Sequence, residues 1–194
     1  MRIFLAGASG VLGARLTPLL VTAGHSVVGV TRSSDRIGLL AGLGAEPVVC
    51  DVFDADVLTA AVVAAKPDVV MHQLTDLPDT VAELNAATGA ANARIRREGT
   101  RNLLAAAAAA GVRRIYAQSV AWQIEGDGGL AVADLERMVT EAGGVVLRYG
   151  HFYGPNTYHP NTMPDEPRIH IDRAAELTVS ALAATAGPVT IVDD

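Results

Sequence analysis

The first thirteen residues restrict the possible folds of this chain more than any other part of it. Residues 2–6 form a short apolar run, and GASGVLG (residues 7–13) then carries glycine at every third position before a helical apolar pattern begins. A strand, a glycine-rich turn and a helix in this order are typical of a dinucleotide-binding unit. Gly7 allows a sharp turn, Gly10 lets backbone N–H groups approach a pyrophosphate, and Gly13 lets the helix pack closely.

Apolar runs and helical patterns alternate along the rest of the chain. The alternation predicts an α/β fold, a doubly wound parallel sheet of the Rossmann type with about seven strands and helices on both faces. At 194 residues, the whole chain (1–194) is expected to be a single NAD(P)-binding domain. Residues 150–171 lack periodicity and are expected to be a reduced substrate-binding loop. The predicted strands are 2–6, 26–31, 46–50, 69–74, 114–118, 145–149 and 189–192, and the predicted helices are 11–23, 35–43, 55–65, 80–110, 130–142 and 172–184.

The net charge and the cysteine content indicate which partners the protein can bind and in which cellular compartment it works. The net charge is −6, and no run of Lys or Arg appears, which argues against nucleic acid and anionic membranes. A single cysteine, Cys50, fits a reducing cytoplasm, and Met1 leads straight into the first strand with no signal peptide. We therefore expect a cytoplasmic protein with a small-molecule substrate; the oligomeric state stays open, with a homodimer as one alternative.

Two polar positions at strand ends bear on the cofactor. A dinucleotide fold places a ribose-binding acid at the end of its second strand, but Arg32 stands there, beside Ser33. Arginine matches a 2′-phosphate in charge and fork geometry, which favours NADP(H) over NAD(H), the alternative being a solvated loop arginine. Asp51, after the third strand, either bonds the adenine amine or caps the next helix.

Several stretches in order resemble the extended short-chain dehydrogenase/reductases, specifically the NAD(P)-dependent epimerase/dehydratase-like group. They are LAGASGVLGARL, DVVMHQL, GTRNLLAAA, YAQSVA, VVLRYGHFYGP, IHIDRAAELTVSAL and VTIVDD, and they span nearly the whole chain. The resemblance and the glycine turn together imply a set of cofactor-binding residues at the ends of the first four strands. These are Gly7, Ser9, Gly10, Val11, Leu12, Gly13, Arg32, Ser33, Asp51, Val52, Gln73 and Leu74.

The chain departs from this family in its proton relay and in its size. Family members carry Tyr-x-x-x-Lys on the helix after the fifth strand, where tyrosine moves the proton and lysine lowers the tyrosine pKa. Anchored on Glu136, those positions are Gly128 and Val132, and Lys66 is the only lysine in the chain. The substrate lobe shrinks to about 20 residues. The resemblance is therefore to an atypical member.

The candidates for catalysis lie after the fifth and sixth strands. Ser119 matches the family serine that bonds a substrate carbonyl or hydroxyl, the alternative being a strand-end serine that satisfies backbone. His151 and Tyr149 follow or end the sixth strand, and a histidine there can act as a general acid or base near neutral pH. His159, in the long loop, is a further substitute. For each the alternative is a structural residue. The His and Asp spacing matches no metal site, so no metal is expected.

Two function classes remain open from the sequence. The first is a small NADP(H)-binding enzyme on a small organic substrate, working either as an oxidoreductase or in a repurposed isomerisation, cyclisation or elimination. The second is a catalytically inactive dinucleotide-binding sensor or regulator. The missing tyrosine and lysine suit both a non-redox step and a sensor, while the polar, aromatic-rich loop favours an enzyme pocket.

Overall fold

Seven parallel strands form the central sheet in the computed structural model, which describes residues 1–193. The order β3-β2-β1-β4-β5-β6-β9 confirms the predicted doubly wound topology, and all neighbouring strands are parallel. The chain runs outward from β1 in one direction and from β4 in the other, so ligands are expected at the carboxyl ends of these two strands. The strands are β1 Arg2–Ala6, β2 Ser26–Thr31, β3 Glu46–Val49, β4 Val69–His72, β5 Arg114–Val120, β6 Val145–Tyr149 and β9 Gly187–Ile191.

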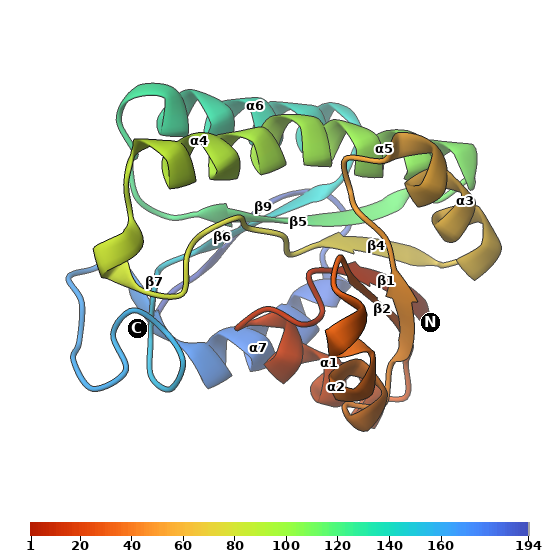
Figure 1. Cartoon of the computed structure of the whole chain (residues 1–194), viewed down its shortest axis with the longest axis horizontal. Helices are drawn as coiled ribbons and strands as arrows, with labels where there is room; N and C mark the ends of the chain where they lie inside the picture. The colour runs from red at the N-terminus through yellow and green to blue at the C-terminus, as the bar shows by residue number, and fades with distance from the viewer. Residues whose placement is uncertain (194) are drawn as a thin grey trace.

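Helices cover both faces of the sheet, as Figure 1 shows. On one face lie α1 Gly13–Thr22, α2 Ile37–Gly42 and α7 Ile171–Ser180. The other face carries α3 Ala55–Ala65, α4 Ala86–Arg94, α5 Thr100–Ala109 and α6 Gly126–Glu141. Short 3-10 turns occupy Ser34–Arg36, Val81–Glu83 and Ala181–Ala183.

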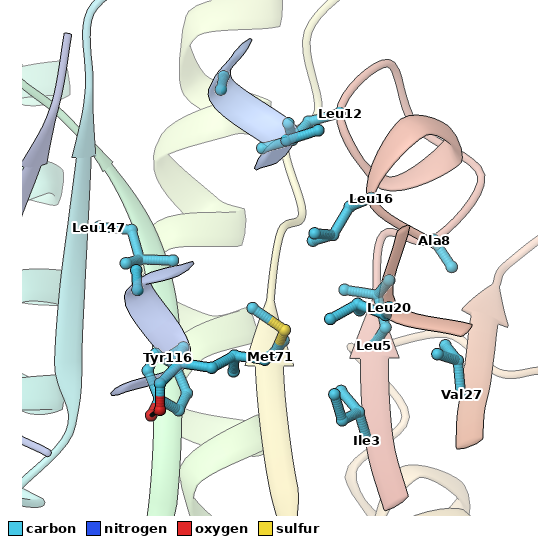
Figure 2. Packing of buried hydrophobic residues seen from close by; sticks show 14 of the residues in the cluster. Ile3, Leu5, Ala8, Leu12, Leu16, Leu20, Val27, Met71, Tyr116 and Leu147 are labelled. Atoms are coloured by element: carbon cyan, nitrogen blue, oxygen red, sulfur yellow. Dashed lines mark hydrogen bonds between the residues drawn. The ribbon is translucent and has the colours of Figure 1, made fainter. Parts of the chain in front are cut away.

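The core on the α1 face is built from aliphatic side chains of small and medium size. Leu16 and Leu20 of α1 pack on Leu5 and Met71 of the sheet, and all four are fully buried. Figure 2 shows these leucines lying over neighbouring strands. With only 4% aromatic residues, the chain fills this layer by close approach of helix and sheet.

The long helix predicted over 80–110 is divided into three parts. Asn85 starts α4 as its N-cap, because its side-chain oxygen accepts from the N–H groups of Ala87 and Thr88 at 2.9 and 3.2 Å. A π-turn, η3 Ile95–Gly99, then joins α4 to α5. Such turns insert one extra residue into a helix and often mark functional positions.

Several strand and helix ends differ by a few residues from the sequence prediction, and three differences affect the site. The helix expected from residue 130 begins at Gly126. The stretch expected to be a loop, 150–171, contains two short parallel strands, β7 His151–Tyr153 and β8 Arg168–His170. α7 is capped by His170, whose Nδ1 accepts from the N–H of Asp172, and not by Asp172 itself.

Truncating the buried side of α1 is expected to destabilise the fold. Leu16→Ala should lower the free energy of unfolding by about 2–5 kcal/mol, because it leaves a cavity between α1 and the sheet. The control is Leu19→Ala on the same helix, where the side chain is 36% exposed and the loss should stay near or below about 1 kcal/mol. Urea denaturation measures both, and equal losses would contradict the packing described.

Candidate cofactor and substrate site

The glycine turn brings the backbone of β1 and α1 against the end of β4. Gly7 has a φ of +92°, and a Cβ there would lie 2.5 Å from the carbonyl oxygen of Gln73. A Cβ on Gly13 would overlap the Gly7 carbonyl oxygen. At Gly10 the added atom would meet only that same oxygen, at 3.3 Å, so the space beyond Gly10 is open. Two glycines therefore serve the turn itself, and the third keeps a surface clear for a ligand.

A cavity of about 210 Å³ opens beside this turn at the carboxyl ends of β1, β2 and β4. Most of the predicted cofactor residues line it, whereas Val11, Leu12, Gly13 and Ser33 do not. The predicted residues at the cavity are Gly7, Ser9, Gly10, Arg32, Asp51, Val52, Gln73 and Leu74. The sequence reasoning missed others, including Arg36, Phe53, Thr75 and Ile95. The turn thus shares one cavity with three strand ends.

The end of β2 supplies two arginines to this cavity. Arg32 pairs with Asp76 at 2.9 Å and is 65% exposed at its side chain, so this ion pair is weak and can exchange. Arg36 lines the same cavity and makes no ion pair within residues 1–193. The sequence could have indicated Arg36 only through its position four residues after Arg32. In the structure it ends the 3-10 turn that follows β2.

Gln73 carries a buried acceptor without a partner. Thr178 donates its only proton to the Ala174 carbonyl at 2.6 Å, so it accepts from the Tyr149 hydroxyl at 2.7 Å. Tyr149 therefore accepts from the Gln73 amide nitrogen at 3.2 Å. This chain of donors fixes the amide orientation and leaves Gln73 Oε1 buried and unpaired among the described residues. A buried acceptor beside an open glycine turn fits a ligand rich in hydroxyl and amide donors, as a dinucleotide is.

The same network removes Tyr149 from the set of accessible groups. Its ring is 1% exposed and packs in the core under α7, and burial raises the pKa of its hydroxyl despite its hydrogen bonds with Thr178 and Gln73. A hydroxyl held this way cannot reach a substrate or release a proton near neutral pH. The sequence placed Tyr149 at the edge of the site, but its side chain points to the opposite face from Ser119.

Ser119 is held by an ion pair from the neighbouring helix and strand. Its hydroxyl donates to Glu136 Oε1 at 2.6 Å, and Arg148 donates to the same carboxylate through two nitrogens. Burial alone would raise the pKa of Glu136, but the hydrogen bonds from Arg148 and Ser119 and the Arg148 charge outweigh it and lower that pKa. Glu136 is thus a carboxylate at neutral pH. Ser119 is itself buried, and with its proton given to Glu136 its hydroxyl oxygen can only accept a further hydrogen bond.

His151 lies against the indole of Trp122, the only tryptophan of the chain. The two rings stack with centroids 3.8 Å apart and an interplanar angle of 24°. Burial lowers the pKa of His151, the charge of His159 adds to this, and Asp165 opposes it. The imidazole is therefore neutral at pH 7. Within the described chain, no hydrogen bond joins His151 to Ser119, although Ser119 lies near the end of β5 and His151 follows the neighbouring strand β6.

The loop after β7 is fastened on two sides. Arg15 of α1 pairs with Asp172 at 2.7 Å and donates to the Pro155 carbonyl at 2.6 Å. The Tyr158 hydroxyl donates to the Pro78 carbonyl at 2.6 Å. Among the described residues, the His159 side chain hydrogen-bonds only Thr162 of its own loop, at 3.4 Å. These contacts hold the loop beside the glycine turn and the segment after β4.

The two positions of α6 at which the resembling family carries its proton relay have no ionisable side chain. Gly128 and Val132 occupy successive turns before Glu136. Among residues 1–193, no three His, Cys, Asp or Glu side chains group in a way that could hold a metal ion. The helices in this range are also too short or too polar to cross a bilayer.

The comparison with known proteins identifies the class of this fold and site. Residues 3–128 match the model of the NAD dependent epimerase/dehydratase family. The chain belongs to this family. It also resembles the NAD-bound UDP-glucose 4-epimerase of Thermus thermophilus, with a TM-score of 0.80 at 18% identity over 99% of this chain and 78% of that one. That likeness supports the fold.

Two curated relatives are more informative about sequence. A 3-diazoavenalumate denitrifying reductase from a Streptomyces species is 40% identical over 184 residues, which cover 81% of this chain and 58% of that protein. An uncharacterised protein of Mycobacterium tuberculosis is 30% identical over 98% of this chain and 21% of its own length. The chain thus spans less than two thirds of the length of these relatives.

A side chain at Gly10 is expected to abolish dinucleotide binding without unfolding the protein. Gly10→Val adds atoms toward open space at the turn, so the unfolding midpoint should change little while NADP⁺ affinity falls at least about tenfold. Gly89→Val, in open space on α4, is the matched control and should leave affinity unchanged. Calorimetric titration measures both. Wild-type affinity in Gly10→Val would mean that the turn does not hold the cofactor.

Proposed function

We propose that this protein is an NADP(H)-dependent reductase of a small organic substrate. The observation that carries the proposal is the shared cavity between the glycine turn, two arginines at the end of β2 and the end of β4. We place the substrate near Ser119, Trp122 and His151, which lie outside this cavity at the carboxyl ends of β5 and β6. The reductase relative at 40% identity supports this class of reaction over a sensor without activity.

The preference for NADP(H) rests on the two arginines. Gly7, Ser9 and Gly10 would hold the pyrophosphate against the start of α1, and Arg32 and Arg36 would take the 2′-phosphate. The exposed Arg32–Asp76 pair can open for such a ligand, since an exposed ion pair contributes about 0–1 kcal/mol. Arg36 could bind the 2′-phosphate without first breaking an ion pair.

Removing either arginine is expected to reverse this preference. Arg32→Ala and Arg36→Ala should each weaken NADP⁺ binding about tenfold or more, because a charge-assisted hydrogen bond is lost, with NAD⁺ affinity nearly unchanged. Asp76→Asn should strengthen NADP⁺ binding, and Arg113→Ala, exposed before β5, is the charge-matched control. Calorimetry with both cofactors decides. Equal loss for NAD⁺ and NADP⁺ would contradict a phosphate contact.

The substrate we propose is a compound that carries its own leaving group, such as an aryl diazonium ion. The reduced cofactor would supply a hydride when bound, and the diazonium carbon that accepts it would release N₂ with the electron pair of the broken C–N bond. Such a step consumes no proton from the protein. This agrees with a site in which Gly128 and Val132 carry no proton and Ser119 has committed its own to Glu136.

The chain's residues then orient the substrate and exclude water. The rings of Trp122 and His151, which follow β5 and β6, stack on each other and are partly buried. Ser119 offers an acceptor on the other side, because Glu136 holds its proton. His159, in the loop after β7, stays the candidate proton donor for a substrate that needs a proton.

The direct test is an assay with 3-diazoavenalumate and NADPH. We expect NADPH oxidation with loss of nitrogen from the substrate. Deuterium from the labelled cofactor should appear at the carbon that carried the diazo group, and deuterium from solvent should not. Nucleotide binding without turnover of this compound or of simpler aryl diazonium ions would contradict the proposal.

His151 is expected to be nearly dispensable for this reaction. Its lowered pKa keeps the ring neutral at pH 7, where it is a poor acid, so His151→Ala should retain turnover within about tenfold and the wild-type rate should stay flat above about pH 7. His151→Phe is the matched variant that keeps the stack on Trp122. A fall of about 10² or more in both would assign His151 the general-acid role instead.

A further inference from the structure

The π-turn between α4 and α5 contains an arginine that the chain leaves without a partner. Arg94 pairs with Glu98 at 2.7 Å and lies 3.8 Å from the centre of the Phe53 ring. Arg97 pairs with Asp127 and Asp134 at 2.7 and 2.9 Å. Arg96, between them, makes no hydrogen bond or ion pair with any residue from 1 to 193, although it is partly buried. A guanidinium removed from water without an anion is costly and calls for an explanation.

Arg96 lies on the side of the helix that faces the end of β4. One turn before it, Asn92 accepts from the N–H of Asp76 at 3.1 Å. One turn after it, Thr100 bonds His72 Nε2 at 3.1 Å. Both neighbours thus contact β4 or the segment that follows it, and Arg96 stands between them.

The described chain supplies no anion to Arg96 at this place. Burial, followed by the charge of Arg96, lowers the pKa of His72 to about 4, so His72 is neutral and close to the guanidinium. His72 Nδ1 accepts from the N–H of Leu74 at 3.2 Å, which leaves the proton on Nε2 for Thr100. Burial also lowers the pKa of Arg96, as expected for a cation without a counter-ion.

The turn that carries Arg96 borders the substrate end of the site. It packs against α6, where Arg97 of the same turn pairs with Asp127 and Asp134. In the sheet below, Ala117 is the register partner of His72, and Ser119 comes next on the same face of β5. Arg96 and Ser119 therefore border one end of the sheet, on the opposite face from the network of Gln73 and Tyr149.

We propose that Arg96 binds a carboxylate of the substrate, so that this protein acts on small organic acids. The inference rests on the proposed reductase function and names its substrate class. A planar guanidinium takes a carboxylate through two parallel hydrogen bonds. The cofactor phosphates have their own places at the glycine turn and at Arg32 and Arg36, which leaves Arg96 for the substrate.

The test uses benzoate as the probe and benzamide as its neutral match. Trp122, the only tryptophan, reports binding at this end of the site through its fluorescence. With NADP⁺-saturated protein, benzoate should bind more tightly than benzamide. Arg96→Gln should weaken benzoate binding at least about tenfold, with benzamide and NADP⁺ affinity unchanged. Arg96→Lys should recover part of the loss, and Arg101→Gln, exposed on α5, is the charge-matched control.

Three other results would contradict the assignment of Arg96 to a substrate carboxylate or the function on which it rests, and each can be told apart from the others. Equal binding of benzoate and benzamide to the wild type, or no effect of Arg96→Gln on benzoate, would show that no carboxylate is recognised there. Loss of NADP⁺ affinity in Arg96→Gln with benzoate binding intact would assign the guanidinium to the cofactor. Failure of the reductase proposal would appear separately, as benzoate binding that depends on Arg96 in a protein that oxidises no NADPH.

Discussion

The close approach between the β1–α1 turn and the end of β4 is the constraint on which the site depends. Gly7 turns the chain at a positive φ beside the Gln73 backbone, and Gly13 lets α1 begin against Gly7. This contact places α1 over β1 and β4, where Leu16 and Leu20 fill the core. It also leaves Gln73 under the turn with one buried acceptor free. A single packing constraint thus fixes the helix, the core layer and the cofactor cavity.

The sequence was sufficient for the sheet because each strand is a short apolar run with clear breaks. β2, β6 and α3 have the predicted bounds, and the order of strands follows from the alternation. The division of the long helix was not visible, since Asn85 and the extra residue of the π-turn interrupt a run of good helix formers only through local hydrogen bonds. The pairing of β7 with β8 joins residues 17 positions apart and depends on tertiary contacts.

Site positions could be predicted where the backbone conformation requires a particular residue, such as glycine. Positions that depend on side-chain contacts could be predicted less well. Glycine spacing located the turn, and Arg32 marked the end of β2. Tyr149 and Ser119 were both catalytic candidates from the sequence, yet strand alternation sends Tyr149 into the core under α7 and Ser119 toward Glu136. Arg96 resembled its neighbours Arg94 and Arg97, and only the contacts separate the paired arginines from the unpaired one.

The loss of the tyrosine and lysine is built into the packing of α6. A Cβ on Gly129 would overlap the Ile124 carbonyl oxygen, and one on Gly128 would lie 3.0 Å from the Ile124 side chain. The helix therefore begins close against residue 124, in a form that a bulky residue at 128 would disturb. Restoring the tyrosine at 128 would require the Ile124 side chain to shift, and restoring the lysine at 132 is a second substitution. Chemistry at this site has to use a donor from elsewhere or a reaction that needs none, and the neutral His151 and the committed proton of Ser119 favour the second.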